Sequence, residues 1–313
     1  MRQRGVAVVT ALLLTTLAVT IVASLFWQQQ VQVRTIENQR LQQQAKWVLL
    51  GSLDWARLIL REDAKHSSVD HLGEPWATPL AETRLDDYLE KGSSDNGVAQ
   101  AAIAGQIVDA QARFNLTNLA SAGMVNATEL AVFERLLASL NLNPSLARRV
   151  AEAVASAQAG GVTGADGDSG RKVEQQALPL GIAHVDDLQS ISGFSPEIVV
   201  LLRDFVVVLP RFTPINVNTA SAEVLAARMG NLSLSDAKMV TVTREQAYFR
   251  DGADFIQRLP ANSRQFASMS EITVSTSYFI VQGKARVERA SQQIEALIER
   301  GHNGTSIVWI RDY

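Results

Sequence analysis

Apolar positions dominate the start of the chain and then recur at the spacing of a helix. No charged residue occurs from Val6 to Trp27, and Gln28–Gln30 ends the run. A helix of about 20 apolar residues crosses the roughly 30 Å of hydrocarbon in a bilayer. Beyond the run, a further stripe recurs at helical spacing, namely Leu41, Ala45, Val48, Ser52, Trp55 and Ile59. Because no proline precedes Pro75, the pattern predicts one helix from about Val6 to Leu60.

The flanks of the apolar run predict its orientation. Arg2 and Arg4 precede it, and positive charge next to a spanning segment keeps that side in the cytoplasm. The run is longer than the core of a secretory signal, and no Ala-x-Ala site follows it. We therefore expect a membrane-retained helix with the rest of the chain exported. A plain membrane tether is the alternative for such a helix.

Downstream, strand patterns flank a long helical region. Residues 103–116, 272–280 and 306–311 alternate between apolar and polar residues, as half-buried strands do, whereas residues 290–300 fit either a strand or a helix. Residues 61–100 are predicted to be loop, with a helical turn or two within Leu80–Lys91. Helices are expected at Ala127–Leu140, Leu146–Gln158, Val185–Ile191, Pro196–Leu209, Ala220–Met229 and Ser235–Tyr248. This order predicts an α+β fold in which a helical insertion interrupts one sheet.

Two short segments within the helical region resemble each other. Phe114–Ala120 and Pro214–Ala220 both place Asn, Thr or Ser just before an apolar-periodic helix, where N-caps are needed. In the second segment Thr219 or Ser221 could cap, with Glu223 reaching back. The echo indicates two related helical units.

Composition removes several classes of function. Lys and Arg number 29 against 32 Asp and Glu, so no global positive field recruits nucleic acid. The absence of cysteine excludes disulfides, thiol catalysis and thiolate-bound metals. The four histidines are scattered, and no Gly-x-Ser-x-Gly, phosphate-binding loop or His-Glu-x-x-His motif occurs. The sequence predicts a protein that is not an enzyme.

One loop has the residues of a cation site. Gly160–Gly170 carries Asp166 and Asp168 on a glycine-rich backbone, which offers oxygen ligands to a hard cation. Glu174, together with Asp186 or Asp187, would complete the set of cation ligands if the fold places them next to the loop. The alternative is a flexible, solvated loop without a metal.

The N-terminus resembles the leader of type IV pilin-like proteins, on the residues Arg4–Leu14. The resemblance implies that a prepilin peptidase cuts after Gly5 and methylates the amine of Val6. Most members have Glu at the fifth mature position, where this chain has Thr10. A missing Glu is the pattern of the minor pseudopilin K of type II secretion, also called general secretion pathway protein K. A carboxylate in lipid is costly unless it is paired, whereas a threonine hydroxyl can bond back to a helix carbonyl.

Further segments resemble the same family over nearly the whole chain. They are His184–Leu188, Ser192–Phe194, Asn216–Leu225, Ser277–Phe279 and the terminus around Trp309. The implied organisation is a leader at 1–5, a transmembrane part at 6–27 and a periplasmic part of the same helix at 28–60. A pilin-like α/β domain follows at 61–117 and 269–313, with a small antiparallel sheet that makes 290–300 a strand. A large all-α domain at 118–268 is inserted between the strands.

The resemblance also implies a function and partners. It predicts a structural subunit at the tip of a pseudopilus that initiates or caps assembly for the export of folded proteins across the outer membrane. The chain would be a single-pass protein of the bacterial inner membrane. Expected partners are the minor pseudopilins I and J, with H as a further candidate, the prepilin peptidase, the inner-membrane assembly platform and secreted proteins. The family binds calcium in its helical domain, and Gly164–Asp166 lies about where the acidic segment of the family lies. In the family, a Trp and further acidic residues precede that segment. This chain has Ala153-Val154-Ala155-Ser156-Ala157 there instead.

Two other hypotheses remain at this stage. Ile215–Ala227 also resembles the helix-hairpin-helix of DNA-uptake receptors, which would make the chain a membrane-anchored nucleic-acid receptor. The hairpin position, Met229–Asp236, lacks paired glycines and ends in a carboxylate that would repel phosphate. The other hypothesis is a membrane-tethered periplasmic adaptor outside any filament, which would keep Met1.

Overall fold

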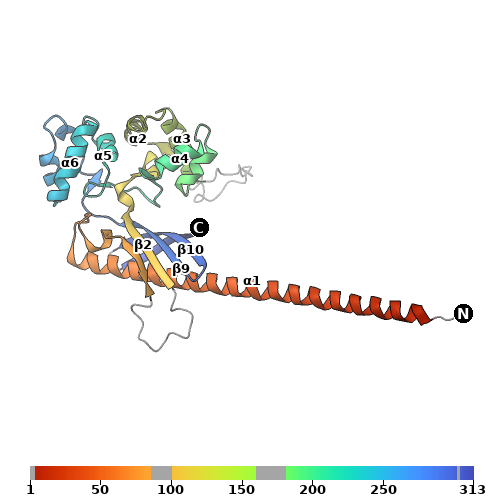
Figure 1. Ribbon diagram of the computed structural model, residues 1–313. Coiled ribbons are helices and arrows are strands. Elements are labelled where there is room, and N and C mark those ends of the chain that lie inside the picture. The colour runs from red at the N-terminus through yellow and green to blue at the C-terminus, as the bar shows by residue number, and fades with distance from the viewer. Residues whose placement is uncertain (1–3, 86–100, 160–180, 302–303) are drawn as a thin grey trace, which may run out of the picture.

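The computed structural model describes residues 4–85, 101–159, 181–301 and 304–313. A single long helix, α1 (Arg4–His66), projects from the body with its N-terminal half bare. A sheet covers its C-terminal half, and a helical body lies beyond the ends of the strands (Figure 1). The predicted architecture of a long apolar helix, an antiparallel sheet and a helical insertion is confirmed.

The buried stripe of α1 differs in part from the predicted one. Its buried residues are Leu41, Ala45, Leu49, Leu53, Ala56 and Leu60. Trp55, expected in the stripe, is 49% exposed. The sequence holds two adjacent apolar lines at helical spacing, and periodicity alone does not say which one meets the sheet. The helix also runs on to His66, where Lys65 and His66 lie at the negative end of its dipole.

The sheet is antiparallel and five-stranded, in the order β1 (Leu80–Arg84), β2 (Ala101–Asp109), β9 (Tyr278–Val287), β10 (Ala290–Gly301) and β11 (Gly304–Asp312). Residues 290–300 thus form a strand, and so do residues 306–311. The prediction of helical turns within Leu80–Lys91 is wrong for its first part, because Leu80–Arg84 is a strand that pairs with β2. Such a short segment gains more from completing a sheet than from an isolated helical turn.

The insert leaves the sheet between neighbouring strands. The strand predicted at 103–116 ends at Asp109, whose carboxylate accepts the Gln111 N–H (2.7 Å) and starts a 3-10 turn, η4 (Ala110–Ala112). The chain returns at Tyr278, and Asp109 pairs with Phe279. The alternation predicted at 272–280 is therefore split between the short strand β8 (Ile272–Thr273) and β9.

The insert is built of short helices joined by two-residue strands. Its helices are α2 (Ala127–Ser139), α3 (Leu146–Ala159), α4 (Pro196–Leu202), α5 (Ala222–Met229), α6 (Leu234–Gln246) and α7 (Gly252–Arg258), with 3-10 turns η5 (Leu116–Leu119), η6 (Val185–Ser190) and η7 (Arg264–Phe266). Another 3-10 turn, η1 (Pro75–Ala77), precedes the sheet. The helix expected at Pro196–Leu209 stops at Leu202, and α7 was not predicted. Val185–Ile191 forms a 3-10 turn, not an α-helix.

The echoed segments fold alike. Each contains a two-residue strand in a parallel pair: β3 (Phe114–Asn115) with β6 (Val206–Val207), and β7 (Ile215–Asn216) with β8. The third short pair is β4 (Ala120–Ser121) with β5 (Met124–Val125). The Asn115 and Asn216 side chains each accept the N–H two residues on. Ser221, not Thr219, caps α5. The sequence echo therefore reflects a repeated local structure.

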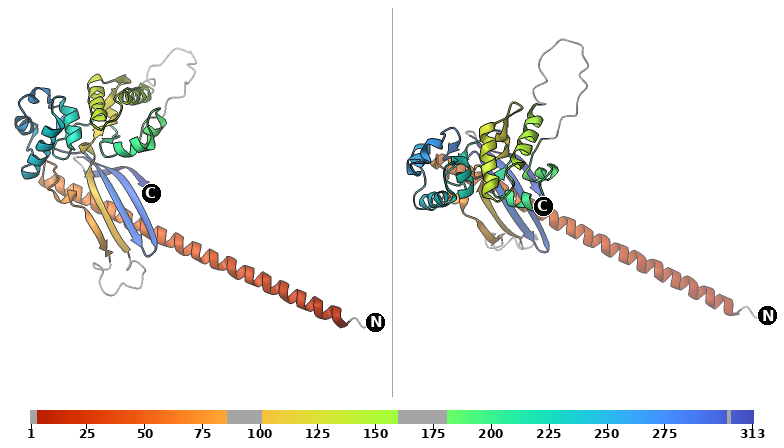
Figure 2. Two further views of the ribbon diagram at one scale, coloured as in Figure 1. Left: turned by 45° about the horizontal axis from the view of Figure 1, so that its top comes forward. Right: turned by 90° about the horizontal axis from the view of Figure 1, so that it is seen from above.

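The sheet lies between α1 and the insert. On one face, Phe279, Val281 and Ile298 pack against the buried stripe of α1. On the opposite face, Val207 and Leu209 of the insert pack on Tyr278 and neighbouring residues. The insert has its own larger core, and Figure 2 shows it across the strand ends on the side away from α1.

Candidate functional site

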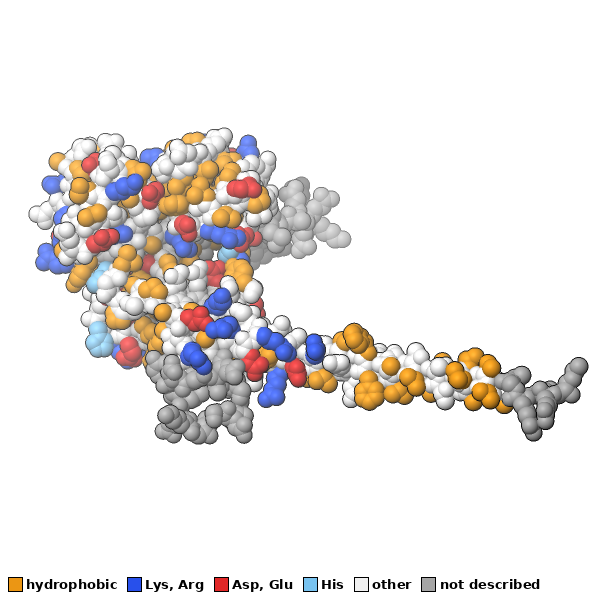
Figure 3. Space-filling view, viewed as in Figure 1, with side chains coloured by type: hydrophobic (Ala, Val, Ile, Leu, Met, Phe, Trp, Pro, Cys, Tyr) orange, Lys and Arg blue, Asp and Glu red, His pale blue; other side chains and the backbone are white. Residues whose placement is uncertain are grey.

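The first functional feature is the bare half of α1. Its helix contains an 18-residue window of mean hydropathy 2.3, none of it buried, and Figure 3 shows the apolar side chains along the projecting rod. This half fits a single-pass membrane anchor. Gly5 and Val6 lie in its first turns. The Thr10 hydroxyl donates to the Ala7 carbonyl (3.0 Å), so this polar group has a partner within the helix.

A second apolar stripe lies on α1 directly opposite the sheet. Trp47 and Leu58 are 70% and 43% exposed, and Trp55 borders them. Gly51 lies between the tryptophans, and a Cβ added there would meet no atom within 4 Å. We call Trp47, Gly51, Trp55 and Leu58 the outward stripe. A glycine between two large side chains forms a notch that another helix can enter.

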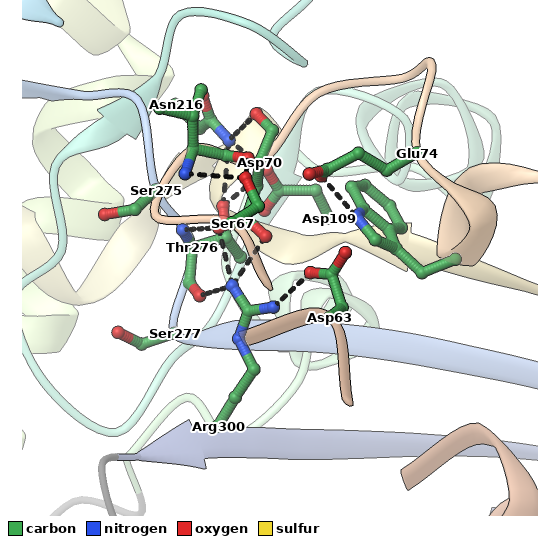
Figure 4. A network of polar contacts seen from close by, with 12 residues as sticks. Asp63, Ser67, Asp70, Glu74, Asp109, Asn216, Ser275, Thr276, Ser277 and Arg300 are labelled. Atoms are coloured by element: carbon green, nitrogen blue, oxygen red, sulfur yellow. Dashed lines mark hydrogen bonds and ion pairs between the residues drawn. The ribbon is translucent and has the colours of Figure 1, made fainter. Parts of the chain in front are cut away.

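A polar junction joins α1, the sheet and the insert (Figure 4). It comprises Asp63, Asp70, Asp109, Asn216, Thr276 and Arg300. Arg300, near the end of β10, donates to Asp63 (2.8 Å), to Asp70 (2.6 Å) and to the Thr276 carbonyl (2.9 Å). The Asp70 carboxylate also accepts the Thr276 N–H (2.6 Å). The Arg300 guanidinium on β10 thus contacts two other segments, the end of α1 with the loop after it (residues 63–70) and the loop at Thr276.

The other half of the junction centres on Asn216. Its amide donates to the Asp109 carboxylate (2.8 Å), to the Thr276 hydroxyl (3.0 Å) and to the Asp70 carbonyl (3.1 Å). The hydroxyls of Thr219 and Thr276 each donate to Asp109 at 2.6 Å. Burial raises the pKa of Asp109 to about 6 even though these donors favour the ionised form. The junction therefore connects the end of β2 to the start of the second helical unit.

The carboxylates of Asp63, Asp70 and Glu74 form a cluster whose ligand atoms lie within 4.8 Å of one another. Burial raises the pKa of Asp63 to about 6 and also raises that of Asp70. Arg300 already supplies the positive charge, and Glu74 accepts from the Trp76 ring N–H (2.8 Å). Arg300 and Trp76 thus give the three carboxylates polar partners within the protein.

The predicted cation ligands Asp166, Asp168 and Glu174 lie outside the described residues, so they stay a prediction. The other two candidates have defined roles. Asp186 binds Arg203 (2.7 and 2.9 Å), and Asp187 accepts the N–H groups of Ala183 and His184. These contacts hold the 3-10 turn that begins at Val185.

A cleft of about 580 Å³ separates the outer face of the sheet from the insert. His184 of the insert approaches Glu295 of β10 (3.9 Å). The interaction with His184 is the largest effect that lowers the pKa of Glu295 to about 2. Glu295 also accepts from Gln282 (2.9 Å) and Tyr313 (3.2 Å). Of these contacts, the one from His184 crosses the cleft, while Gln282 and Tyr313 hold Glu295 from within the sheet domain.

The expected DNA-binding hairpin does not have the structure of a phosphate site. Ser233 caps α6 by accepting the Asp236 N–H (3.1 Å), and the Asp236 carboxylate accepts the Ser233 hydroxyl (2.7 Å). A phosphate at this helix start would meet the Asp236 carboxylate.

Of the site residues predicted from sequence, Gly5, Val6 and Thr10 lie together at the start of α1, far along the rod from the body. The junction residues Asp63, Asp70, Asp109 and Arg300 were not predicted. Their only sequence signal was the Asn216–Ala220 segment, which contributes Asn216 and Thr219.

Comparison with known families decides which class of protein carries this architecture. The family described as "Type II secretion system (T2SS), protein K" matches residues 112–211 with one of its sequence profiles and 215–275 with another. The chain belongs to the type II secretion system protein K family. It therefore shares the minor pseudopilin role of that family. The boundary between the profiles falls between β6 and β7, where the second echoed segment begins.

Relatives in the protein K family align along nearly the whole chain. The type II secretion system protein K of Pseudomonas aeruginosa is 29% identical over 99% of this chain and 92% of its own length. That of Pectobacterium carotovorum subsp. carotovorum is 27% identical over 91% and 89%. The fold matches a chain in the crystal structure of the GspK-GspI-GspJ complex from enterotoxigenic Escherichia coli. The TM-score is 0.67 and the identity 21%, covering 90% of this chain and 99% of that one.

Proposed function

We propose that the chain is the tip subunit of a type II secretion pseudopilus. It initiates or caps the filament, which serves the export of folded proteins across the outer membrane. Its partners are the minor pseudopilins I and J, with H next in the assembly. The support is membership of the protein K family, together with the likeness to a chain crystallised with GspI and GspJ.

The observation that carries the proposal is the outward stripe of α1. Trp47, Gly51 and Leu58 form an exposed apolar line opposite the sheet, separated from the bare apolar half of the helix by the exposed charged residues Arg34, Glu37 and Arg40. Such a line is favourable only when another apolar surface covers it. An apolar helix of a neighbouring pseudopilin, rising from the same membrane, is the natural occupant.

The bulk of the insert supports a position at the end of the filament. It occupies the outer face of the sheet and extends beyond the strand ends (Figure 2). A body of this size is difficult to fit between subunits that pack closely on every side. The contribution of the chain is thus geometric, and no catalytic role is proposed.

The N-terminus enters this proposal as a processing site. The prepilin peptidase cuts after Gly5 and methylates Val6, and Arg2 and Arg4 keep this end cytoplasmic in the inner membrane. Thr10 replaces a carboxylate that a subunit at the tip would have no neighbour to neutralise. An intact Met1 in the mature protein, measured by mass spectrometry, would favour a tethered adaptor instead.

The experiment is co-purification of the full-length chain with the pseudopilins I and J of the same bacterium. Trp47→Gln should lower the recovered partners by more than about tenfold, because an exposed tryptophan at an interface commonly contributes over 2 kcal/mol. Met239→Gln is the matched control, since Met239 is equally exposed but lies on α6. Salt-sensitive DNA binding without affinity for I or J would contradict the proposal and favour the receptor hypothesis.

A further inference from the structure

The last strand of the sheet leaves one edge open. Within the described part of the chain, β11 pairs with β10 on one side and with no strand on the other. It is a nine-residue strand whose middle is apolar. Ile307, Val308 and Ile310 are 37%, 38% and 40% exposed. A long apolar edge is a template for another strand, and proteins usually blunt it.

The opposite edge shows what blunting looks like in this same sheet. Strand β1 has only five residues, and its register shifts between Leu80 and Thr83. Its Glu82 forms an ion pair with Arg286 of β9. Short length and charge discourage further strand addition. A register shift occurs at both edges, because β11 also shifts between its partners Leu297 and Ile298. The contrast shows that the apolar composition of β11 is not a general property of the edges.

Backbone directions show which groups of β11 are available. The Tyr313 N–H donates to the Gln293 carbonyl of β10 (2.9 Å). Because facing directions alternate along a strand, the N–H and C=O groups of Ile310 and Asp312 point away from β10. At the other end, the Thr305 carbonyl points outward as well and accepts from Arg57 (2.9 Å). Since the Thr305 carbonyl is already bonded to Arg57, the open edge offers the N–H and C=O groups of Ile310 and Asp312.

This edge lies along the flank of α1, about a quarter of a helical turn from the outward stripe. Lys46 pairs with Asp312 (2.8 Å), and Arg57 bonds Thr305, so both ends of β11 are fixed against the helix. Trp47 and Leu58 directly follow these two basic residues and turn toward the exposed face. A neighbour whose helix packs on both the outward stripe and this flank would bring its own body next to β11.

We propose that the open edge of β11 receives an extended strand from the neighbouring minor pseudopilin, which adds a sixth strand to the sheet. The inference rests on the proposed function. Backbone hydrogen bonds to Ile310 and Asp312 supply the affinity, and contacts of alternate side chains of the added strand set its register. The apolar side chains of the added strand lie against Ile307 and Ile310.

Hydrogen exchange tests the pairing without any substitution. The full-length chain is compared in detergent, alone and in complex with I and J, by mass spectrometry of peptides from residues 304–313. In the isolated chain the outward amides exchange quickly. In the complex they should slow by more than about tenfold. Unchanged exchange of β11 in a complex that protects the outward stripe overturns this inference and leaves the proposed function standing.

A matched pair of variants tests the same edge. Ile310→Pro removes an outward N–H and places a ring on the open side, while the β10 ladder keeps its bonds. Ile310→Val keeps both the N–H and the β-branched shape. The proline variant should recover at least about tenfold less partner than the valine variant. If the proline variant does not fold, the exchange measurement decides alone.

Two further outcomes overturn the inference. Protection of β11 that grows with the concentration of the isolated chain would identify a second copy as the occupant. If the wild-type chain forms no complex with I or J at all, the proposed function and the strand addition both fail.

Discussion

Asn216 of the insert donates a hydrogen bond of 2.8 Å to Asp109 at the end of β2, with both residues buried. The bond fastens the second helical unit to the sheet where the insert departs. Asn115 performs the corresponding task in the first unit, where its amide donates to the Arg211 carbonyl (2.8 Å) and the Thr213 hydroxyl (3.1 Å). The repeated asparagine is therefore a joint that links segments about a hundred residues apart.

Loss of the Asn216 amide should destabilise the chain markedly. Asn216→Ala removes one of several buried donors to Asp109 and the side-chain donor to the Asp70 carbonyl, at a cost of about 1–3 kcal/mol. Urea unfolding of the full chain, followed by fluorescence, measures the shift in midpoint. Asn231→Ala is the control, because that side chain is exposed. Equal midpoints for the two variants would refute the role given to the junction.

The insert contains a second buried polar pair. Arg228 of α5 binds Glu129 of α2 through two bonds of 2.7 and 2.8 Å, and both side chains are buried. Arg228→Met should cost about 3–5 kcal/mol, because it leaves a buried carboxylate without its charge partner. Adding Glu129→Met should restore at least half of that loss. A double-mutant cycle by urea unfolding decides, and additive losses would show that the pair is not coupled.

Stability should fall as the pH rises from about 4 to 7. Burial and the neighbouring Glu74 and Asp70 raise the pKa of Asp63 from 3.8 to about 6, against the attraction of Arg300. A carboxyl with a raised folded pKa stabilises fully below its unfolded pKa and loses that contribution as the pH passes the folded value. The pKa of Asp109 is also raised to about 6, so its contribution to stability is lost over the same pH range.

Asp63→Asn removes one of these titrations. Its unfolding midpoint should depend less steeply on pH between 4 and 7 than that of the wild type. Asp54→Asn is a suitable control, because Asp54 is an exposed acid on the same helix. Identical slopes in the wild type and Asp63→Asn would show that Asp63 titrates as an ordinary carboxyl.

Substitutions at Gly51 should affect the stability of the chain and its assembly with partners in different ways. Since a Cβ at this position meets no atom, Gly51→Ala should stabilise the isolated chain by about 0.5–1 kcal/mol through helix propensity alone. Gly51→Phe should fill the notch and reduce recovery of the partner pseudopilins while leaving the fold intact. Thermal unfolding and co-purification measure the two effects. Full partner recovery with Gly51→Phe would argue against a helix in the notch.

The acidic loop supplies a prediction that rests on the sequence. If Asp166, Asp168 and Glu174 hold calcium, a chelator should lower the unfolding temperature of the wild type. The variant Asp166→Asn/Asp168→Asn should then unfold at one temperature with or without chelator. Calorimetry in both conditions makes the comparison, and a wild type that does not respond to the chelator would exclude a stabilising calcium site.

Local patterns in the sequence were sufficient for the long helix, for the strand at 306–311 and for most helices of the insert. For residues 290–300 they fitted either a strand or a helix, and the family resemblance favoured the strand. They were insufficient where tertiary contacts choose between equivalent options. The apolar run around Val206 fits a helix or a strand, and its pairing with Phe114 made it a strand. Likewise, only the sheet determines that Leu49, not Trp55, is buried on α1.

The polar junction was beyond sequence reasoning for a different reason. Asp63, Asp109 and Arg300 are single polar residues separated by long stretches of chain, and no local periodicity links them. Their chemistry becomes apparent only when the ends of α1, β2 and β10 meet. The exception is Asn216, whose segment resembles both the first unit and the protein K family.

The most direct test of the assembly account is cross-linking from the outward stripe inside cells. A benzophenone-bearing phenylalanine replaces Trp47 in a strain with an intact secretion system, and a matched strain carries it at Met239. The account predicts a cross-link from position 47 to the minor pseudopilin I or J, and none from position 239. Secretion that proceeds normally with no pseudopilin cross-linked to position 47 would contradict it.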